Sequence, residues 1–219
     1  MNQEKKQLRL AVLISGGGRT LKNFIELSAA DKLPVEIPLV LSSNSQAGGL
    51  EHARNAGIES QVFLRSNYNT AEAYGHALFG ACRQAQVDYV AMAGFLKLAP
   101  LPDDFLGRVL NIHPSLIPSF CGQGMYGQHV HQAVLDSGVK VTGVTVHFVD
   151  NQYDGGPIIW QQPIPVFEDD SVDTLAKRVF EAEKEVYPQV LRQLAAGRIR
   201  LEGGRVSCQK IVVRGQEKA

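Results

Sequence analysis

Three polar residues in the middle of the chain, Asn111, His113 and Asp154, have side chains suited to acid–base chemistry. Asn111 and His113 lie two residues apart at the end of an apolar run, so in a strand their side chains would point to the same side. Asparagine offers a neutral N–H donor and histidine a tunable acid, and together they suit the stabilisation of an oxyanion. Taken alone, such a pair is more often structural, with the histidine hydrogen-bonded beside a strand end.

Asp154 strengthens the catalytic interpretation. It follows a long predicted strand that starts near Gly143, and it opens the turn Asp154-Gly155-Gly156-Pro157. A carboxylate close to His113 would hold the imidazole and favour its protonated form. The alternative is that Asp154 only starts a turn, as Asp-Gly commonly does.

A glycine-rich turn lies near the N-terminus and comprises Gly16, Gly17, Gly18, Arg19 and Thr20. Glycines let the backbone approach an anion closely, and the helix predicted to follow offers free N–H groups. The turn is not a P-loop, which requires a lysine after the last glycine, and it lacks the third glycine of the dinucleotide fingerprint. We therefore expect a single phosphate monoester here. The alternative is a tight turn without a ligand.

The order of predicted elements indicates an α/β fold. Apolar runs predict strands at about 8–14, 35–41, 60–64, 87–92 and 108–112, with helices predicted at about 21–29, 47–56 and 71–84 between the first four. This alternation predicts a mostly parallel twisted sheet with helices on both faces, a Rossmann-like N-terminal half. Two longer runs, 141–149 and 158–166, predict antiparallel strands that extend the sheet. Ser171 is suited to cap a final helix.

The length of 219 residues suits a single domain. We expect one domain over 1–219, with a phosphate-binding half at about 8–100 and a catalytic half at about 101–195. The remaining polar tail, 196–219, is predicted to be a short strand or disordered.

The composition argues against several classes of partner. Lys plus Arg and Asp plus Glu are equal at 22 each, which disfavours bulk capture of nucleic acid or of a membrane surface. No long apolar run predicts a membrane span, and the polar N-terminus does not resemble a signal peptide. The cysteines Cys82, Cys121 and Cys208 are few and widely spaced, which fits reduced thiols. We therefore expect a cytoplasmic protein without nucleic-acid or membrane partners, as a monomer or a homodimer.

Two long segments, Asn111 to Pro118 and Gly143 to Pro157, resemble the two signatures of the folate-dependent formyltransferases. The resemblance extends from about Leu8 to Leu194. Within the family, Ser15 to Gly18 and Ala93 to Leu96 are similar to members that act on glycinamide ribonucleotide. The resemblance implies direct transfer of the formyl group of 10-formyltetrahydrofolate, a co-substrate, to the amine of 5′-phosphoribosylglycinamide through a tetrahedral oxyanion, without a metal.

The resemblance also implies roles for individual residues. Asn111, His113 and Asp154 match the family's catalytic triad. The turn from Gly16 to Thr20 would hold the ribose 5-phosphate, and Glu183 would contact the glycinamide portion. The folate pocket would be lined by Leu96, Lys97, Leu98, Ala99, Asn111, Asp150, Asn151, Gln152, Tyr153 and Asp154.

Two features depart from the family pattern. The loop Cys121 to Gly127 is longer than in several members, and Ala71 stands where some members place an arginine near the folate tail.

Three alternatives remain. Other folate formyl enzymes, the hydrolase and the methionyl-tRNA formyltransferase, carry an extra domain, and Ser115 departs from the hydrolase pattern His-His-Ser-Phe. A non-catalytic nucleotide-binding module would use the glycine turn alone. A metal hydrolase would use His113, His129, His131 and His147, but these lack a HExxH spacing. We expect His147 to be a core or supporting group, and His129 and His131 to begin a helix.

Overall fold

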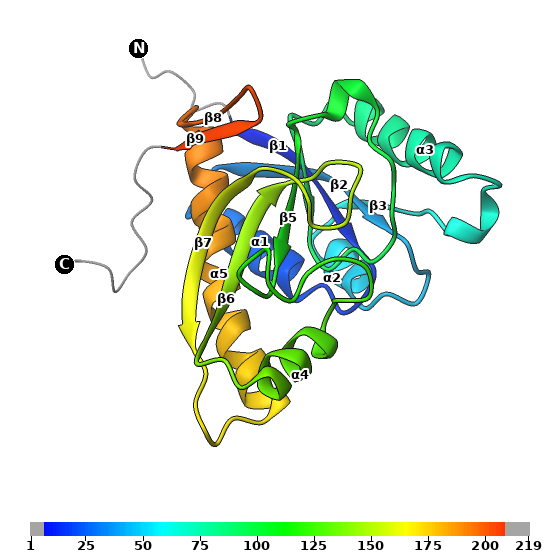
Figure 1. Cartoon of the computed structure of the whole chain (residues 1–219). Helices are drawn as coiled ribbons and strands as arrows, with labels where there is room; N and C mark the ends of the chain where they lie inside the picture. The colour runs from blue at the N-terminus through cyan, green and yellow to red at the C-terminus, as the bar shows by residue number, and fades with distance from the viewer. Residues whose placement is uncertain (1–6, 209–219) are drawn as a thin grey trace, which may run out of the picture.

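The computed structural model describes residues 7–208, which form a seven-stranded sheet (Figure 1). The spatial order is β3-β2-β1-β4-β5-β6-β7. Strands β1 to β5 pair in parallel, and β6 and β7 pair antiparallel, which confirms the predicted fold class. The strands are β1 Leu8–Ile14, β2 Val35–Ser42, β3 Glu59–Val62, β4 Tyr89–Met92, β5 Val109–His113, β6 Val141–Phe148 and β7 Ile158–Pro165.

Helices cover both faces of this sheet (Figure 1). The α-helices are α1 Arg19–Ala29, α2 Gly49–Asn55, α3 Ala71–Gln84, α4 Gln128–Ser137 and α5 Val172–Ala195, and the short 3-10 turns are η1 Arg65–Asn67 and η2 Asp103–Phe105. The residues of strand β1 are almost all apolar because its side chains point alternately into two hydrophobic cores. Leu10 and Val12 pack with α1, α2, α4 and α5, whereas Ala11 and Leu13 pack with α3.

The final long helix, α5, begins where the sequence predicts. The Ser171 hydroxyl accepts a hydrogen bond from the backbone N–H of Thr174, and the Thr174 side chain bonds back to the backbone of Ser171. This reciprocal capping fixes the start of the helix. Its apolar stripe includes Leu175, Val179 and Val186, all fully buried against the sheet.

The order of the strands determines where a ligand site can form. From β1 the chain moves outward to β2 and β3 and then returns to place β4 on the other side of β1. The loops after β1 and β4 therefore leave the carboxyl edge of the sheet in opposite directions. The crevice between two such loops is where open α/β sheets bind ligands. The backbone N–H of Ser15 donates to the carbonyl of Gly94 across it, at 3.1 Å.

The C-terminal segment after α5 forms two strands, where the sequence predicts one short strand or disorder. Strands β8 Ile199–Glu202 and β9 Arg205–Cys208 form a hairpin, and β9 contacts β7. The rest of the predicted tail, 209–219, lies outside the described residues. Within residues 7–208, no helix is both long and apolar enough to cross a membrane.

Candidate active site

The carboxyl end of β5 places Asn111 and His113 on one side of the sheet, as predicted. The neighbouring strand β6 runs antiparallel, so Asn111 pairs with His147 and His113 pairs with Thr145. This register brings His147 beside Asn111 although 36 residues separate them in the chain. His113 is 4% exposed and His147 is 1% exposed. The strand end therefore carries two buried imidazoles and an amide.

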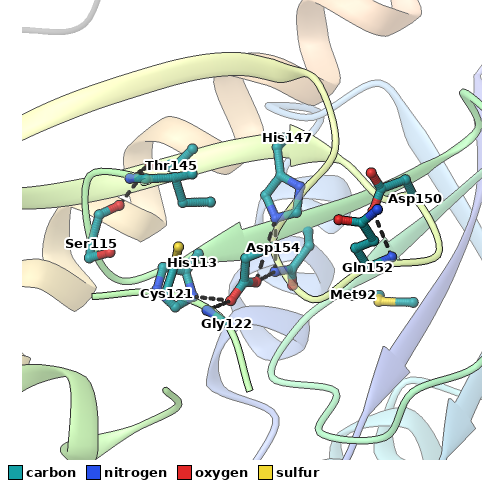
Figure 2. Close-up of polar contacts among 12 residues, drawn as sticks. Met92, His113, Ser115, Cys121, Gly122, Thr145, His147, Asp150, Gln152 and Asp154 are labelled. Atoms are coloured by element: carbon teal, nitrogen blue, oxygen red, sulfur yellow. Dashed lines mark hydrogen bonds and ion pairs between the residues drawn. The ribbon is translucent and has the colours of Figure 1, made fainter. Parts of the chain in front are cut away.

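Asp154 reaches this group from the loop between β6 and β7 (Figure 2). Its Oδ2 lies 3.5 Å from the Nδ1 of His113, and its Oδ1 lies 3.5 Å from the Nδ2 of Asn111. The turn after it needs glycine, because a Cβ on Gly156 would stand 1.9 Å from the carbonyl oxygen of Phe148. The Asp-Gly-Gly turn thus aims the carboxylate inward, and the structure brings the three predicted catalytic side chains together.

Both ring nitrogens of His113 face oxygen atoms. Its Nε2 lies 2.8 Å from the carbonyl oxygen of Phe120, to which it can only donate. Its Nδ1 faces the carboxylate of Asp154, and the backbone N–H of Gly122 donates to the same carboxylate oxygen at 2.9 Å. Only the doubly protonated ring offers a hydrogen to both oxygen partners. The loop after β5 therefore contacts both members of the pair.

The surroundings of His147 favour the neutral imidazole. Burial lowers the pKa of His147, and the nearby charge of Asp154 opposes this effect only in part. Its Nδ1 donates to the carbonyl of Phe148 at 2.9 Å, which leaves Nε2 to accept from the amide of Asn111 at 3.2 Å. This hydrogen bond fixes which way the Asn111 amide faces, with its N–H groups toward Asp154. His147 is thus a supporting group, as predicted.

The glycine-rich turn connects β1 to α1 at the same edge of the sheet. Gly18 caps α1 in the left-handed region, with φ of 68°, and no side chain caps the free N–H groups. A Cβ at Gly18 would stand 2.5 Å from the Cα of Gly49, so close packing on α2 also demands glycine. The turn therefore presents uncapped backbone donors, which is the arrangement that binds anions at helix N-termini.

One cavity of about 310 Å³ joins the turn to the polar cluster. The residues predicted from the sequence that line it are Gly16, Gly17, Gly18, Arg19, Thr20, Leu96, Asn111, His113, Tyr153, Asp154 and Glu183. Glu183 approaches from α5, and burial raises its pKa to about 7, with Arg19 opposing the shift. The phosphate turn and the polar cluster therefore face one space.

Six of the predicted folate-pocket residues lie outside the lining of this cavity: Lys97, Leu98, Ala99, Asp150, Asn151 and Gln152. Ala99 is 3% exposed and belongs to the core beneath α3. The side chain of Asn151 accepts from the backbone N–H of Leu101 at 2.7 Å, and Asp150 accepts from the N–H of Gln152 at 2.8 Å. Asn151 and Asp150 therefore hold these loops in shape, and the folate-binding role of the six residues stays a prediction.

Several residues that line the cavity were not predicted as ligand-binding residues from the sequence. Ala176 and Phe180 come from α5, His131 comes from α4, and Gly122, Gly124, Met125, Tyr126 and Gly127 come from the longer loop. On α5, Ala176, Phe180 and Glu183 recur at helical spacing on one face, a signal that could have indicated a second wall. His129 and His131 lie in the first turn of α4, as predicted.

The four histidines of the metal-hydrolase alternative, His113, His129, His131 and His147, all lie among the described residues. Within residues 7–208, no group of three His, Cys, Asp or Glu side chains is placed to hold a metal ion.

The family model described as formyl transferase matches residues 8–191. The chain belongs to the formyl transferase family. It is 37% identical over 196 residues to the phosphoribosylglycinamide formyltransferase of Escherichia coli strain K12, a match that covers 89% of this chain and 90% of that one. It is 38% identical over 196 residues to the chloroplastic phosphoribosylglycinamide formyltransferase of Vigna unguiculata, and this match covers 89% of this chain.

Solved structures agree with the family assignment. The glycinamide ribonucleotide transformylase 1 of Symbiobacterium toebii superposes with a TM-score of 0.87 at 37% identity, with 95% of this chain and 96% of that chain covered. The chain spans 63% of the length of the Vigna unguiculata relative.

Proposed function

We propose that the chain transfers the formyl group of 10-formyltetrahydrofolate to the amine of 5′-phosphoribosylglycinamide, in purine biosynthesis. The observation that carries this proposal is that Asn111, His113 and Asp154 share one cavity with an uncapped glycine-rich turn. That cavity can hold a phosphate at one end while an amine reacts beside the polar cluster. The Escherichia coli and Symbiobacterium toebii relatives, named for this activity, support the same substrates.

The ribonucleotide would bind along the floor of the cavity. The backbone N–H groups after Gly18 donate to the phosphate, and the side chain of Arg19 adds a positive charge. Glu183 lies on the opposite wall and accepts a hydrogen bond from the ribose or glycinamide portion. This arrangement directs the amine toward His113.

The folate would enter past two apolar side chains at the cavity wall. Leu96 is 47% exposed and Tyr153 is 45% exposed, although both line the cavity. Exposed apolar side chains that line the same cavity as Asp154 suit a flat heterocycle, because binding removes both the ring and these side chains from water. The residues present therefore fit the co-substrate.

The reaction forms a bond from the amine nitrogen to the formyl carbon and breaks the bond from that carbon to N10 of the folate. One proton passes from the amine to N10. Asn111 and protonated His113 donate hydrogen bonds to the formyl oxygen as negative charge develops on it. The contact of the Asn111 amide with Asp154 is long at 3.5 Å, so this hydrogen is available to be redirected. Asp154, whose carboxylate faces the His113 ring, assists the proton transfer.

We also propose that the protein works in the cytoplasm. Cys82 and Cys121 form no disulfide, which is typical of a reducing compartment.

An acceptor-dependence assay tests the proposed function. The purified chain is mixed with 10-formyltetrahydrofolate, with and without 5′-phosphoribosylglycinamide, and the formation of tetrahydrofolate is followed by absorbance. We expect tetrahydrofolate to form only when the ribonucleotide is present. Equal formation in its absence would indicate a hydrolase, and no formation in either mixture would favour a binding module.

A further inference from the structure

The side chain of Arg19 stacks on an aromatic ring of the opposite cavity wall. Its guanidinium carbon lies 4.1 Å from the centroid of the Phe180 ring, and both residues line the cavity. Phe180 comes from α5, one turn before Glu183. A guanidinium over an aromatic face is attracted electrostatically, and this stacking limits the directions in which its N–H groups can point.

Arg19 differs from other arginines that stack on phenylalanine here. Arg178 lies 4.2 Å from the Phe167 ring, but its guanidinium also donates twice to Asp170 at 2.7 Å. Arg83 likewise donates to Asp104 at 2.8 and 2.7 Å. Within residues 7–208, the Arg19 guanidinium has no hydrogen bond or ion pair. Its donors are therefore available to a ligand.

Two further observations indicate that this ligand is an anion. Helix α1 begins at Arg19 with no side chain capping its N–H groups. His131 is 6% exposed and lines the same cavity, and no described residue partners its Nδ1. Burial and then the charge of Arg19 lower the pKa of His131, so the two side chains lie within electrostatic range. A neutral imidazole with an unused nitrogen can donate to a phosphate oxygen.

We propose that Phe180 is a positioning residue, which holds the Arg19 guanidinium over the phosphate of the acceptor substrate. The stack makes the site selective for a phosphorylated ribose over the free sugar. This inference rests on the proposed function for the identity of the acceptor substrate, but the binding of a sugar phosphate does not depend on that function. Lys184 also lies near this ring, at 5.9 Å, yet its Nζ is paired with Glu181 at 2.8 Å.

The test measures binding of ribose 5-phosphate by titration calorimetry, with ribose as the unphosphorylated comparison, so it needs no catalysis. We expect Arg19→Gln to weaken binding by about 10- to 100-fold, because a charge-assisted contact is lost. Phe180→Leu should weaken it by about 3- to 10-fold, and Phe180→Tyr should stay within about twofold of the wild type. Phe167→Leu removes a stack of the same kind away from the cavity and should leave binding unchanged.

The double variant Arg19→Gln, Phe180→Leu separates positioning from a structural role. If Phe180 acts through Arg19, the double variant binds about as weakly as Arg19→Gln alone. Independent effects would multiply instead and overturn the proposal, as would wild-type binding by Phe180→Leu. Thermal unfolding of each variant shows whether it is folded. If Phe180→Leu does not fold, the proposal is tested by Phe180→Tyr, and it is overturned if folded Phe180→Tyr binds ribose 5-phosphate more than about twofold more weakly than the wild type. In the formyl transfer assay, Phe180→Leu should raise the KM for the ribonucleotide with kcat and the KM for folate retained.

The two proposals can fail separately. Sugar-phosphate binding with this pattern in a chain that transfers no formyl group would refute the proposed function and leave the role of Phe180 intact. Formyl transfer without coupling between the two variants would refute only the role of Phe180.

Discussion

Asp154 and His113 form an almost buried pair, with 3.5 Å between the carboxylate Oδ2 and the imidazole Nδ1. The exposed fraction is 4% for the side chain of His113 and 12% for that of Asp154. Water screens a pair in such surroundings weakly, so the carboxylate stabilises the charged imidazole more than a surface partner would. The N–H of Gly122 donates to the same oxygen and holds the carboxylate in this orientation.

Replacing Asp154 with asparagine should keep the shape of the pair and remove its charge. We expect kcat to fall by about 100-fold or more, because the carboxylate that faces the His113 ring and assists the proton transfer is lost. Turnover at saturating concentrations of both substrates measures the effect. Asp136→Asn, on the outer surface of α4, serves as the control and should keep wild-type turnover. A kcat for Asp154→Asn near that of the control would show that the carboxylate has no catalytic role.

Asn111→Ala should remove one donor to the developing oxyanion. A loss of about 10²–10³ in kcat is expected, with little change in the KM of the ribonucleotide. Steady-state kinetics with each substrate varied in turn provide the measurement. Asn55→Ala, at the exposed end of α2, is the matched control. The assigned role is wrong if Asn111→Ala retains more than about a third of wild-type turnover.

Thr145 stabilises the loop that follows β5. Its hydroxyl donates to the carbonyl of Ser115 at 2.7 Å and accepts from the N–H of Ile117 at 3.1 Å and from Gln161 at 3.0 Å. Thr145→Val removes the partner of the buried Ser115 carbonyl and of the Ile117 N–H, whereas Gln161 still donates to the carbonyl of Ile117 at 2.9 Å. The free energy of unfolding should therefore fall by about 2 kcal/mol. Thr142 is equally buried on the same strand, but no described residue bonds to its hydroxyl.

Thr142→Val is therefore the control for Thr145→Val. It should change the free energy of unfolding by less than about 0.5 kcal/mol or increase it, since no hydrogen bond is lost. Urea unfolding followed by circular dichroism compares the two variants. Equal losses in both would show that the network around Thr145 contributes nothing.

Glu183 should make the stability of the chain depend on pH. Burial raises its pKa from 4.5 to about 7, so the folded chain keeps this proton to higher pH than the unfolded chain. The free energy of unfolding therefore falls as the pH rises between these two values and levels off above them. The full shift corresponds to about 3 kcal/mol, and water entering the cavity reduces it to about 1–2 kcal/mol.

Glu183→Gln is uncharged at every pH and should lack this dependence. Urea unfolding of the wild type and of the variant, at about pH 5 and about pH 8, measures it. We expect the free energy of unfolding of Glu183→Gln, relative to that of the wild type, to be higher at about pH 8 than at about pH 5 by about 1–2 kcal/mol. A relative stability that is the same at both values would contradict the assignment.

Much of the framework could be predicted because it depends on local pattern. Apolar runs separated by polar segments predict the five strands that pair in parallel, and Ser171 marks the start of α5 because serine is a favoured N-cap residue. Helix α3 covers residues 71–84, as predicted. The pairing of Asn111 and His113 at a strand end follows from the alternation of side chains along a strand.

Other features depend on contacts between distant segments, which periodicity does not encode. The position of His147 beside Asn111 follows from the register between β5 and β6. Phe180 shares a helix face with Ala176 and Glu183, but only the packing of α5 against α1 places Arg19 over its ring. Ala99 lies close in sequence to Leu96, yet the chain turns it into the core beneath α3. The role of Glu183 is predicted by the family resemblance alone.

The fate of the formyl group tests the central claim most directly. The chain is incubated with 10-formyltetrahydrofolate labelled with ¹³C in the formyl group and with 5′-phosphoribosylglycinamide, and the products are observed by NMR. The account predicts that the label appears in the formamide of the ribonucleotide, at one equivalent per tetrahydrofolate released. Label recovered as formate, with the ribonucleotide unchanged, would contradict it.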